Sequence, residues 1–558
     1  MEAPRSQFAV KWLPSLTDFA FLMPVALLFG KMGGVNALLS DCDTGWHIRT
    51  GDWIVTNRLI PTHDVFSFSK PGGVWFAWEW LSDVLFASLN SAAGLRAVVL
   101  FSLLLLCVTF ALLFRLVRQH ANPVVAFVIT IIAAAASSVH WLARPHLFTM
   151  FFLVVFCGVL ERVRCGQTHI GGLPWFVLLP VLTVLWTNLH GGFFVGIMLL
   201  GIYGAGELAG ALFSADQQSR RPAVLRARRY FGTALGCLVA SLVNPYTYRL
   251  HLHLWQYLRD PYASRHIGEF LSLSFHHPIA IFFESMLLLA GASIFWYGSH
   301  GRFIEPLQLL VWGHVGLLAA RNIPIFMIVA APIVARAAQV WLAGVPKLEV
   351  AGWVRAAAKQ FNRRAARLAE TDALPRWHAI SLAGVALVAA LLFAPAPPKH
   401  FRSEYDPKSY PAAAINVLRR DPSARIFTND EWGDYLIWRL YPAGRVFVDG
   451  RSDFYGADFE EKYIDVLNVK YNWEQILSDF QVDTILLPPS APLTGALKES
   501  SRWRVVYDDG VALVFRSLHE AGGTPISVAS LGSGAGRDRE VTKTQARDQA
   551  ITDTKPKI

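Results

Sequence analysis

Long apolar runs recur along most of this chain and set its class. They are roughly 17–25 residues long, the length at which a helix spans a bilayer, and short polar segments separate them. Eleven runs are expected to be spanning helices, near residues 12–30, 95–114, 123–140, 147–160, 174–187, 192–212, 230–243, 278–297, 305–319, 323–342 and 377–395. The pattern predicts a multi-pass α-helical membrane protein with about eleven spans.

Composition agrees with this class. The chain has 558 residues, of which 53% are hydrophobic and 16% are charged, whereas soluble domains have about 25% charged residues. The net charge of +10 does not indicate nucleic-acid binding, because the positive residues lie mainly in short loops between apolar runs. We therefore expect a lipid bilayer, and no nucleic acid, among the partners. The five cysteines show neither metal-site spacing nor a disulfide framework.

Lysine and arginine predict the sidedness. When the loops are assigned alternately to two sides, one set carries 19 Lys and Arg and the other carries 9, at similar total length. The positive-inside rule places the richer set, with the N-terminus, in the cytoplasm. An odd number of spans then places everything after residue 395 outside.

The same assignment gathers the unusual polar motifs on the outer side. Polar groups at the helix ends on one side of a bundle are typical of an active site facing that side, although helix ends are also polar for ordinary reasons. Outside the first outer loop, the candidates for substrate binding are Arg144, His146, Asn188, His190 and Arg321.

The first outer loop, residues 31–94, is expected to hold two surface helices, one beginning near Thr44 and one within 74–94. Asp43 and His47 are four residues apart and share a helix face. Asp43 also suits the N-cap of the first helix. Capping does not account for the other polar residues of this loop, so both a capping and a chemical role stay open. The loop also contains Asp41, a further catalytic candidate, and three candidates for substrate binding, Arg49, Asp64 and Glu79.

The composition changes after residue 398. Residues 399–519 are expected to form a soluble outer α/β domain with a mostly parallel sheet, and residues 1–398 the transmembrane domain. Ligands bind outside the carboxyl ends of strands in open α/β sheets, which makes Asp430, Asp449 and Arg451 candidates for acceptor binding. Residues 520–558 lack periodicity and are expected to be disordered.

Two segments carry a resemblance to a known superfamily. "DTGWHIRTGDWIVTNRLIPTHDVFSF" (43–68) is similar in layout to the first outer loop of the GT-C superfamily of membrane glycosyltransferases, which includes protein mannosyltransferases, aminoarabinose transferases and oligosaccharyltransferases. "TNDEWGDYLIW" (428–438) resembles the acceptor motif of oligosaccharyltransferases at Trp432, Asp434 and Tyr435. The second outer loop, "HWLARPHLF" (140–148), lacks the acidic pair of oligosaccharyltransferases, which argues against asparagine-linked transfer.

The resemblance implies a glycosyltransferase of the bacterial inner membrane that acts in the cell envelope. The donor would be a polyprenyl-phosphate-linked sugar, and the acceptor an unknown glycan, lipid or protein on the periplasmic face. Asp43 would be the base and Asp41 its partner, with His47 as a third catalytic candidate. Asp41 and Asp43 are also the candidate ligands if a divalent cation, Mg²⁺ or Mn²⁺, takes part; metal dependence stays open. The alternative is a non-catalytic glycolipid-binding or transport protein of envelope polysaccharide assembly.

Overall fold

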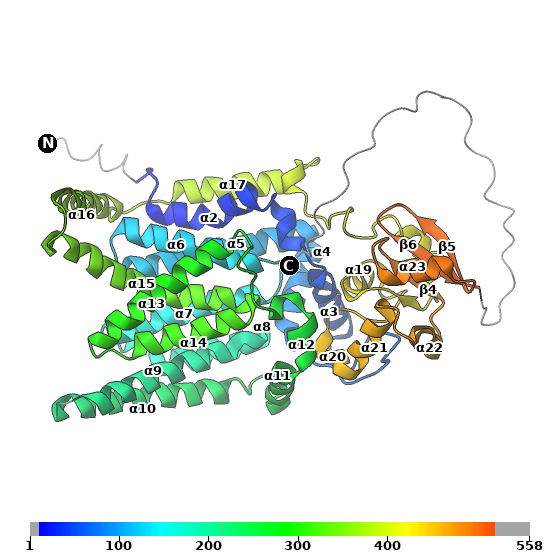
Figure 1. Ribbon diagram of the computed structural model, residues 1–558, viewed down its shortest axis with the longest axis horizontal. Helices are drawn as coiled ribbons and strands as arrows, with labels where there is room; N and C mark the ends of the chain where they lie inside the picture. The colour runs from blue at the N-terminus through cyan, green and yellow to red at the C-terminus, as the bar shows by residue number, and fades with distance from the viewer. Residues whose placement is uncertain (1–10, 215, 519–558) are drawn as a thin grey trace, which may run out of the picture.

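The computed structural model describes residues 11–214 and 216–518. A helical bundle forms one end of the molecule and a small α/β region forms the other (Figure 1). Every segment expected to span the membrane is helical. The helices are α2 (Leu16–Lys31), α5 (Leu95–Arg118), α6 (Pro123–Ser137), α7 (His146–Arg164), α8 (Trp175–Leu189), α9 (Phe194–Phe213), α10 (Gln217–Ala240), α13 (Ala280–Ser299), α14 (Ile304–Leu318), α15 (Ile323–Gly344) and α17 (Ala379–Leu392).

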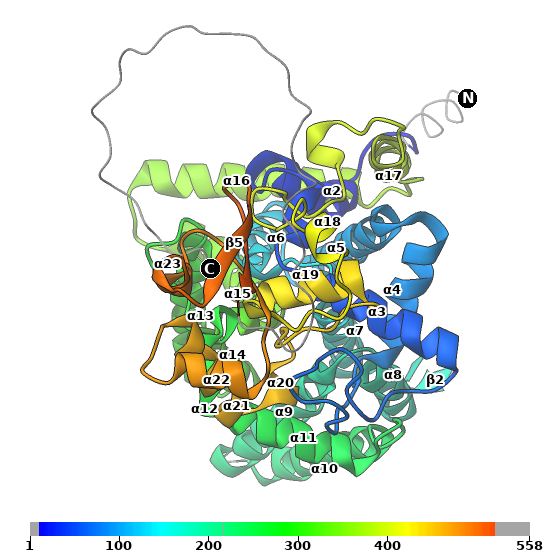
Figure 2. The same ribbon diagram turned by 90° about the vertical axis from the view of Figure 1, so that its right-hand side faces the viewer.

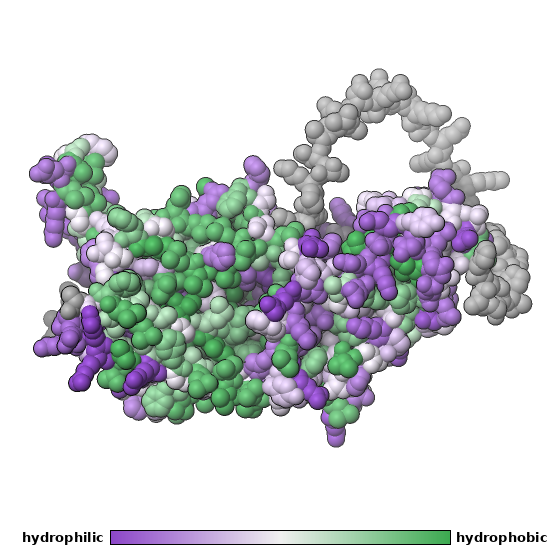
Figure 3. All heavy atoms as spheres, turned by 60° about the horizontal axis from the view of Figure 1, so that its bottom comes forward, coloured by the Kyte–Doolittle hydropathy of each residue, from purple (hydrophilic) through white to green (hydrophobic). Residues whose placement is uncertain are grey.

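Six helical stretches in the described part of the chain are long and apolar enough to cross a membrane. They are Leu95–Arg118, Pro123–His140, His146–Arg164, Gly191–Phe213, Ala280–Ser299 and Ala320–Lys347. Helices α8, α14 and α17 are apolar but shorter, and α10 begins with a basic half. Figure 3 shows apolar residues covering the bundle and polar residues covering the α/β region. A multi-pass helical protein is thus supported, while the count of eleven spans stays a prediction.

The first outer loop forms two helices, as expected. Helix α3 (Asp43–Asn57) and helix α4 (Trp80–Ala93) pack closely against each other. A Cβ atom at Gly51 of α3 would overlap the backbone carbonyl of Asp83 in α4, so the absence of a side chain permits this approach. The close contact fixes the start of α3 relative to the bundle.

Five further strands and α-helices belong to the helical part, besides short 3-10 helices. They are a hairpin of β1 (His169–Ile170) and β2 (Leu173–Pro174), and helices α11 (Tyr248–Arg259), α12 (Pro261–His266) and α16 (Gly352–Asp372).

The α/β region contains a mixed sheet with strand order β3-β4-β6-β5. The strands are β3 (Ile426–Phe427), β4 (Thr484–Leu487), β5 (Trp503–Asp508) and β6 (Leu513–Ser517). Only β3 and β4 pair in parallel; the other two pairs are antiparallel. The expectation of a mostly parallel sheet is therefore wrong. Its helices are α18 (Ile415–Leu418), α19 (Asp430–Leu440), α20 (Ser452–Tyr455), α21 (Ala457–Leu467), α22 (Trp473–Asp479) and α23 (Pro492–Glu499).

Residues 445–449, "RVFVD", have the β-branched and aromatic residues typical of a strand, but they form only isolated bridges. Val446 bridges Ile426 of β3 on one side and Ser67 of the first outer loop on the other. The outer loop thus takes the place of a further strand beside the sheet. The division of the chain at residue 398 stays a prediction, and the expected tail at 520–558 lies outside the described residues.

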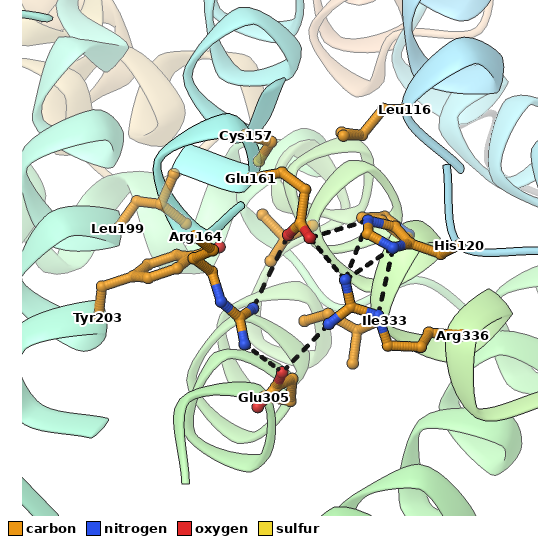
Figure 4. Close-up of a pocket in the computed structure, with 12 residues that line it drawn as sticks. Leu116, His120, Cys157, Glu161, Arg164, Leu199, Tyr203, Glu305, Ile333 and Arg336 are labelled. Atoms are coloured by element: carbon orange, nitrogen blue, oxygen red, sulfur yellow. Dashed lines mark hydrogen bonds and ion pairs between the residues drawn. The ribbon is translucent and has the colours of Figure 1, made fainter. Parts of the chain in front are cut away.

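An ionic network joins the helices at the end of the bundle away from the α/β region (Figure 4). Glu161 of α7 accepts from Arg336 of α15 at 2.6 Å, and Glu305 of α14 accepts from Arg164 at 2.8 Å. His120 accepts a hydrogen bond from Arg336 at 2.7 Å. Because a charge buried without a partner is costly, these pairs hold the ends of three helices in register.

A second buried network holds the α/β region on the first outer loop. The Arg451 side chain is 1% exposed and lies 2.7 Å from Asp449 and 2.8 Å from Asp64 of the loop. Its guanidinium also stacks over the ring of Trp75 at 4.5 Å. The hydroxyl of Tyr455 donates to Asp449 at 2.8 Å. One cation therefore joins two regions that are far apart in sequence.

Replacing Arg451 with methionine should lower the free energy of unfolding by about 3–5 kcal/mol, because Asp64 and Asp449 stay buried without their cation. Thermal unfolding of the purified protein in detergent measures the loss. Adding Asp64→Asn and Asp449→Asn should restore part of it. The control Arg504→Met, on an exposed position of β5, should change stability by less than about 0.5 kcal/mol. Equal losses in both single variants would contradict the assignment.

Candidate active site

Arg144 is the centre of a charged cluster at the end of the bundle that faces the α/β region. It lies in the loop before α7. Its Nη1 atom is 3.0 Å from Asp41 and 3.2 Å from Glu269, and its Nη2 atom is 2.6 Å from Asp43. Glu269 lies between α12 and α13 and also pairs with Arg321 at 3.0 Å. The side chains of these residues are 15–25% exposed, so the cluster is neither sealed nor freely hydrated.

Asp43 does not cap α3, which corrects the capping expectation. Cys42 is the N-cap residue and Asp43 is the first helical residue, without a side-chain capping bond. The carboxylate is instead directed to Arg144. Its place in the first helical turn still suits a negative charge, because the helix dipole is positive there. The same aspartate thus lies in the field of a guanidinium and of a helix N-terminus.

Asp434 brings the α/β region into the cluster. It lies on α19, is 2% exposed, and accepts a hydrogen bond from the backbone N–H of Gly450 at 2.9 Å. A Cβ atom at Gly450 would lie 2.6 Å from Asp434 and 2.8 Å from Asp43, so both carboxyl groups adjoin this glycine. Burial and the neighbouring Asp43 raise the pKa of Asp434 well above its usual value. Burial and Asp43 thus both favour the neutral form of Asp434 over its ionised form.

The other carboxyl groups differ in charge. Burial raises the pKa of Asp41 to about 7, even though Arg144 acts in the opposite direction. Burial also acts to raise the pKa of Glu269, but Arg321 and Arg144 together hold it well below its usual range. The cluster therefore combines a permanently ionised glutamate with an aspartate that titrates near neutral pH. Such a pairing of environments is typical of sites that transfer protons.

Glu79 is the centre of a second group beside Arg144. It precedes α4, and its carboxyl oxygens lie 3.5 Å from Nε2 of His47 and 3.3 Å from Nε2 of His190. Nδ1 of His190 accepts from the backbone N–H of Gly192 at 2.9 Å, which directs the Nε2 proton toward Glu79. Burial raises the pKa of Glu79 to about 8 and lowers that of His190 to about 3. Glu79 is therefore neutral at pH 7.

Asp83 completes this second group. It lies one turn after Glu79 on α4, and its Oδ1 is 2.6 Å from Nδ1 of His47. It is fully buried. His47 is thus held between the carboxyl groups of Glu79 and Asp83. The structure gives His47 an orienting position rather than contact with the Arg144 cluster.

Several predicted residues lie in contacts that explain them without a substrate. Arg49 donates twice to the backbone carbonyl of Trp438 and so holds α19 against α3. Asp64, Asp449 and Arg451 form the buried network described above, which leaves them no open face for an acceptor. The remaining four are engaged locally: Asn188 with Trp80, His146 with the carbonyl of His140, Asp430 with Tyr463, and Trp432 with the carbonyl of Ser409.

The cluster also contains residues that the sequence did not single out. Glu269 lies between α12 and α13 without a motif around it, and only its pairing with Arg144 and Arg321 reveals it. Asp83 had a weak signal, because it follows Glu79 by four residues on a predicted helix. Asp434 was proposed from the motif alone, and its contact with the Asp43 region could not be inferred from spacing.

Two carboxylates of the cluster, Asp41 and Asp43, are the expected ligands of a divalent cation. Within residues 11–214 and 216–518, no three His, Cys, Asp or Glu side chains are grouped to hold a metal ion. Asp41 and Asp43 both pair with Arg144. The guanidinium therefore occupies the position that a metal ion between the two carboxylates would need. The donor set in this arrangement does not fit Mg²⁺ or Mn²⁺, and the reaction below is derived without a metal.

This chain is similar to known proteins at the level of solved structures. No family model and no curated protein matches the sequence. The crystal structure of the apo oligosaccharyltransferase of Archaeoglobus fulgidus matches with a TM-score of 0.52 and 12% identity, over 87% of this chain and 70% of that one. ArnT from Cupriavidus metallidurans, bound to undecaprenyl phosphate, matches with a TM-score of 0.43 and 13% identity, over 90% and 99%. The first match shows that this chain shares its overall fold with that oligosaccharyltransferase.

Glu79→Gln should change the pH dependence of stability. The folded protein keeps the Glu79 proton between pH 4.5 and about 8, where the unfolded chain releases it, so this group destabilises the fold as pH rises. The variant should gain a few kcal/mol over wild type at pH 8 and nothing near pH 4. Thermal unfolding at several pH values measures the difference. Glu461→Gln, exposed on α21, is the control, and a gain independent of pH would contradict the assignment.

Proposed function

We propose, from the fold shared with the GT-C superfamily, that this chain is a membrane glycosyltransferase that uses a polyprenyl-phosphate-linked sugar. The observation that carries the proposal is the Arg144 cluster, in which a cation, a carboxylate and a second cation meet at the end of the bundle. Arg144 and Arg321 supply the positive charge that a phosphate requires. We also propose that the protein lies in the bacterial inner membrane and that its active site faces the periplasm.

The reaction needs a base, and we assign this role to Asp43. The acceptor hydroxyl oxygen attacks the anomeric carbon of the sugar, and the bond from that carbon to the phosphate oxygen breaks. Asp43 takes the acceptor's proton, and the polyprenyl phosphate leaves with the bonding electrons. A positioned general base typically contributes 10²–10⁴-fold in rate. Arg144 and Arg321 stabilise the charge that develops on the leaving phosphate.

Binding of the donor would rearrange the cluster. In the absence of substrate the guanidinium of Arg144 is shared by Asp41, Asp43 and Glu269. A lipid phosphate that pairs with Arg144 competes with these carboxylates and reduces the hold on Asp43. A carboxylate that loses a cationic partner becomes a stronger base. Donor binding would in this way prepare the base for the acceptor.

An apolar groove beside the cluster suits the prenyl chain. It has a volume of about 610 Å³ and lies between α4, α8 and the turn after α10. Its lining is formed by Trp80, Leu81, Val181, Val184, Leu185, Asn188, Val243, Asn244 and Pro245. Trp80 directly follows Glu79, and Asn188 precedes His190 by two residues, so the groove adjoins the charged site. A chain in this groove would present its phosphate near Arg144.

The alternative function is a protein that binds a glycolipid, for envelope assembly or transport, without transferring its sugar. The saturation of Arg144 by three carboxylates is the observation that favours it, because a base held in an ion pair is less available. The two functions differ in whether a bond is broken, which an assay of the purified protein decides.

Asp43→Asn should reduce sugar transfer at least about 10²-fold, because the amide cannot accept the proton. Purified protein in lipid is given radiolabelled polyprenyl-phosphate sugars and a membrane extract as acceptor, with and without added Mg²⁺ or Mn²⁺. The control is Asp52→Asn, the same substitution on the outer side of the same helix, which should keep near wild-type transfer. Transfer that is equal in both variants would remove Asp43 from the mechanism. Donor binding without transfer by wild type would favour the glycolipid-binding alternative.

Leu185→Trp should raise the KM for a long-chain donor several-fold, because the larger side chain fills part of the groove. The kcat should change little, since Leu185 lies away from the reacting groups. A donor with a two-isoprene chain serves as the internal control and should be used equally by variant and wild type. A rise in KM that is independent of chain length would argue that the prenyl chain binds elsewhere.

A further inference from the structure

Helix α16 is a basic helix that lies across the bundle. It is at the end opposite the α/β region (Figure 1), and Figure 2 shows it from the side while the bundle helices are seen nearly end on. A helix perpendicular to spanning helices runs parallel to the membrane plane. Helix α16 therefore lies in the plane of one membrane surface, which we expect to be the cytoplasmic one.

One face of α16 is fixed to the protein. Ala365 is buried and Phe361 packs against the core. The side chain of Asn362 donates to the carbonyl of Leu342. At the end of the helix, Asp372 accepts from the backbone N–H of Leu16 at 2.8 Å and lies 3.9 Å from Arg118. The helix is thus held at a fixed height and rotation relative to the bundle.

The rest of the helix presents unpaired positive charge. Arg355, Lys359, Arg363, Arg364 and Arg367 are all exposed. None of these five side chains forms an ion pair with any residue of the described chain. The arginines of the Arg144 cluster and of the two buried networks, in contrast, are paired with carboxylates. Five fixed cations without an internal counter-charge call for an external anionic partner.

Exposed apolar residues flank this charge. Trp353 at the start of α16 is 77% exposed, and Leu348 just before it is also exposed. Near the other end, Trp377 stacks edge-on with Trp12, and both are exposed. Tryptophan side chains favour the level of the lipid headgroups. The pattern of basic residues between apolar anchors is typical of a helix that lies in the membrane interface.

We propose that α16 binds the anionic phospholipid headgroups of the leaflet against which it lies. A soluble partner would satisfy the charges but would leave the flanking tryptophans in water, whereas a lipid surface accommodates both. Each basic side chain near an anionic surface favours contact by about 1 kcal/mol, which is about fivefold. The proposal does not depend on the transferase reaction, since it concerns the opposite end of the molecule.

The test measures anionic lipid that stays with the full-length protein. The protein is reconstituted with equal amounts of phosphatidylglycerol and phosphatidylcholine and extracted in a neutral detergent, and the retained lipids are quantified by mass spectrometry. Wild type should be enriched in phosphatidylglycerol at least about fivefold. Changing Arg355, Lys359, Arg363, Arg364 and Arg367 to glutamine should remove most of this enrichment.

The control removes the same charge from the other end of the molecule. Lys408, Lys462, Lys470, Lys498 and Arg504 are exposed in the α/β region, and their replacement by glutamine should leave the enrichment unchanged. In wild type, added salt should reduce the enrichment, since such contacts are screened. Enrichment that survives the five α16 substitutions, or that the control set removes equally, would overturn the proposal. Because the five residues make no internal ion pairs, unchanged thermal unfolding verifies that the variant folds.

Discussion

The guanidinium of Arg144 is the constraint on which the arrangement of the candidate site depends. A cation that is largely withdrawn from water at the end of an apolar bundle is costly unless carboxylates surround it. Two of the carboxylates that pair with Arg144, Asp41 and Asp43, lie at the start of α3. The third, Glu269, lies in a loop more than two hundred residues later. The close packing of α3 on α4 then fixes the direction of Asp43. One electrostatic requirement thus places a segment of the first outer loop and a segment of a later loop side by side.

Arg451 has the same effect on the other side of the site. Its two carboxylate partners, Asp64 and Asp449, belong to the outer loop and to the α/β region, and it joins them with almost no exposure. This junction holds α19 over the cluster, which brings Asp434 beside Asp43. The two arginines differ in what they allow. Arg451 is sealed by aromatic rings and suits a permanent joint, whereas Arg144 stays partly exposed, so an entering phosphate has access to it.

The sequence predicts local features well and long-range features poorly, for physical reasons. The helices follow from apolar runs, which are local signals, while the sidedness drawn from the bias of Lys and Arg stays a prediction. Asp43 and Arg144 were recognisable because the unusual polar motifs lie at the helix ends on one predicted side of the bundle. Glu269 was not, because its role comes from a pairing across the fold. Residues 445–449 read as a strand, but the outer loop competes for their hydrogen bonds. Arg451 was a candidate for acceptor binding because it follows a predicted strand, and its burial against Trp75 leaves no mark in the sequence.

The distribution of charge along the bundle also bears on how the site is held at the membrane. At the end away from the α/β region, Glu161 and Glu305 neutralise arginines inside the bundle. The exposed positive charge at that end lies on α16 and on the basic first half of α10. At the other end Arg144 and Arg321 are paired with carboxylates of the site, while Arg249, Arg259 and Arg265 are exposed on α11 and α12. An anchor on α16 would act only on the leaflet at its own end of the bundle. It would fix the bundle's depth without contacting the groove beside α8, so the donor's phosphate and the Arg144 cluster would meet at a constant height.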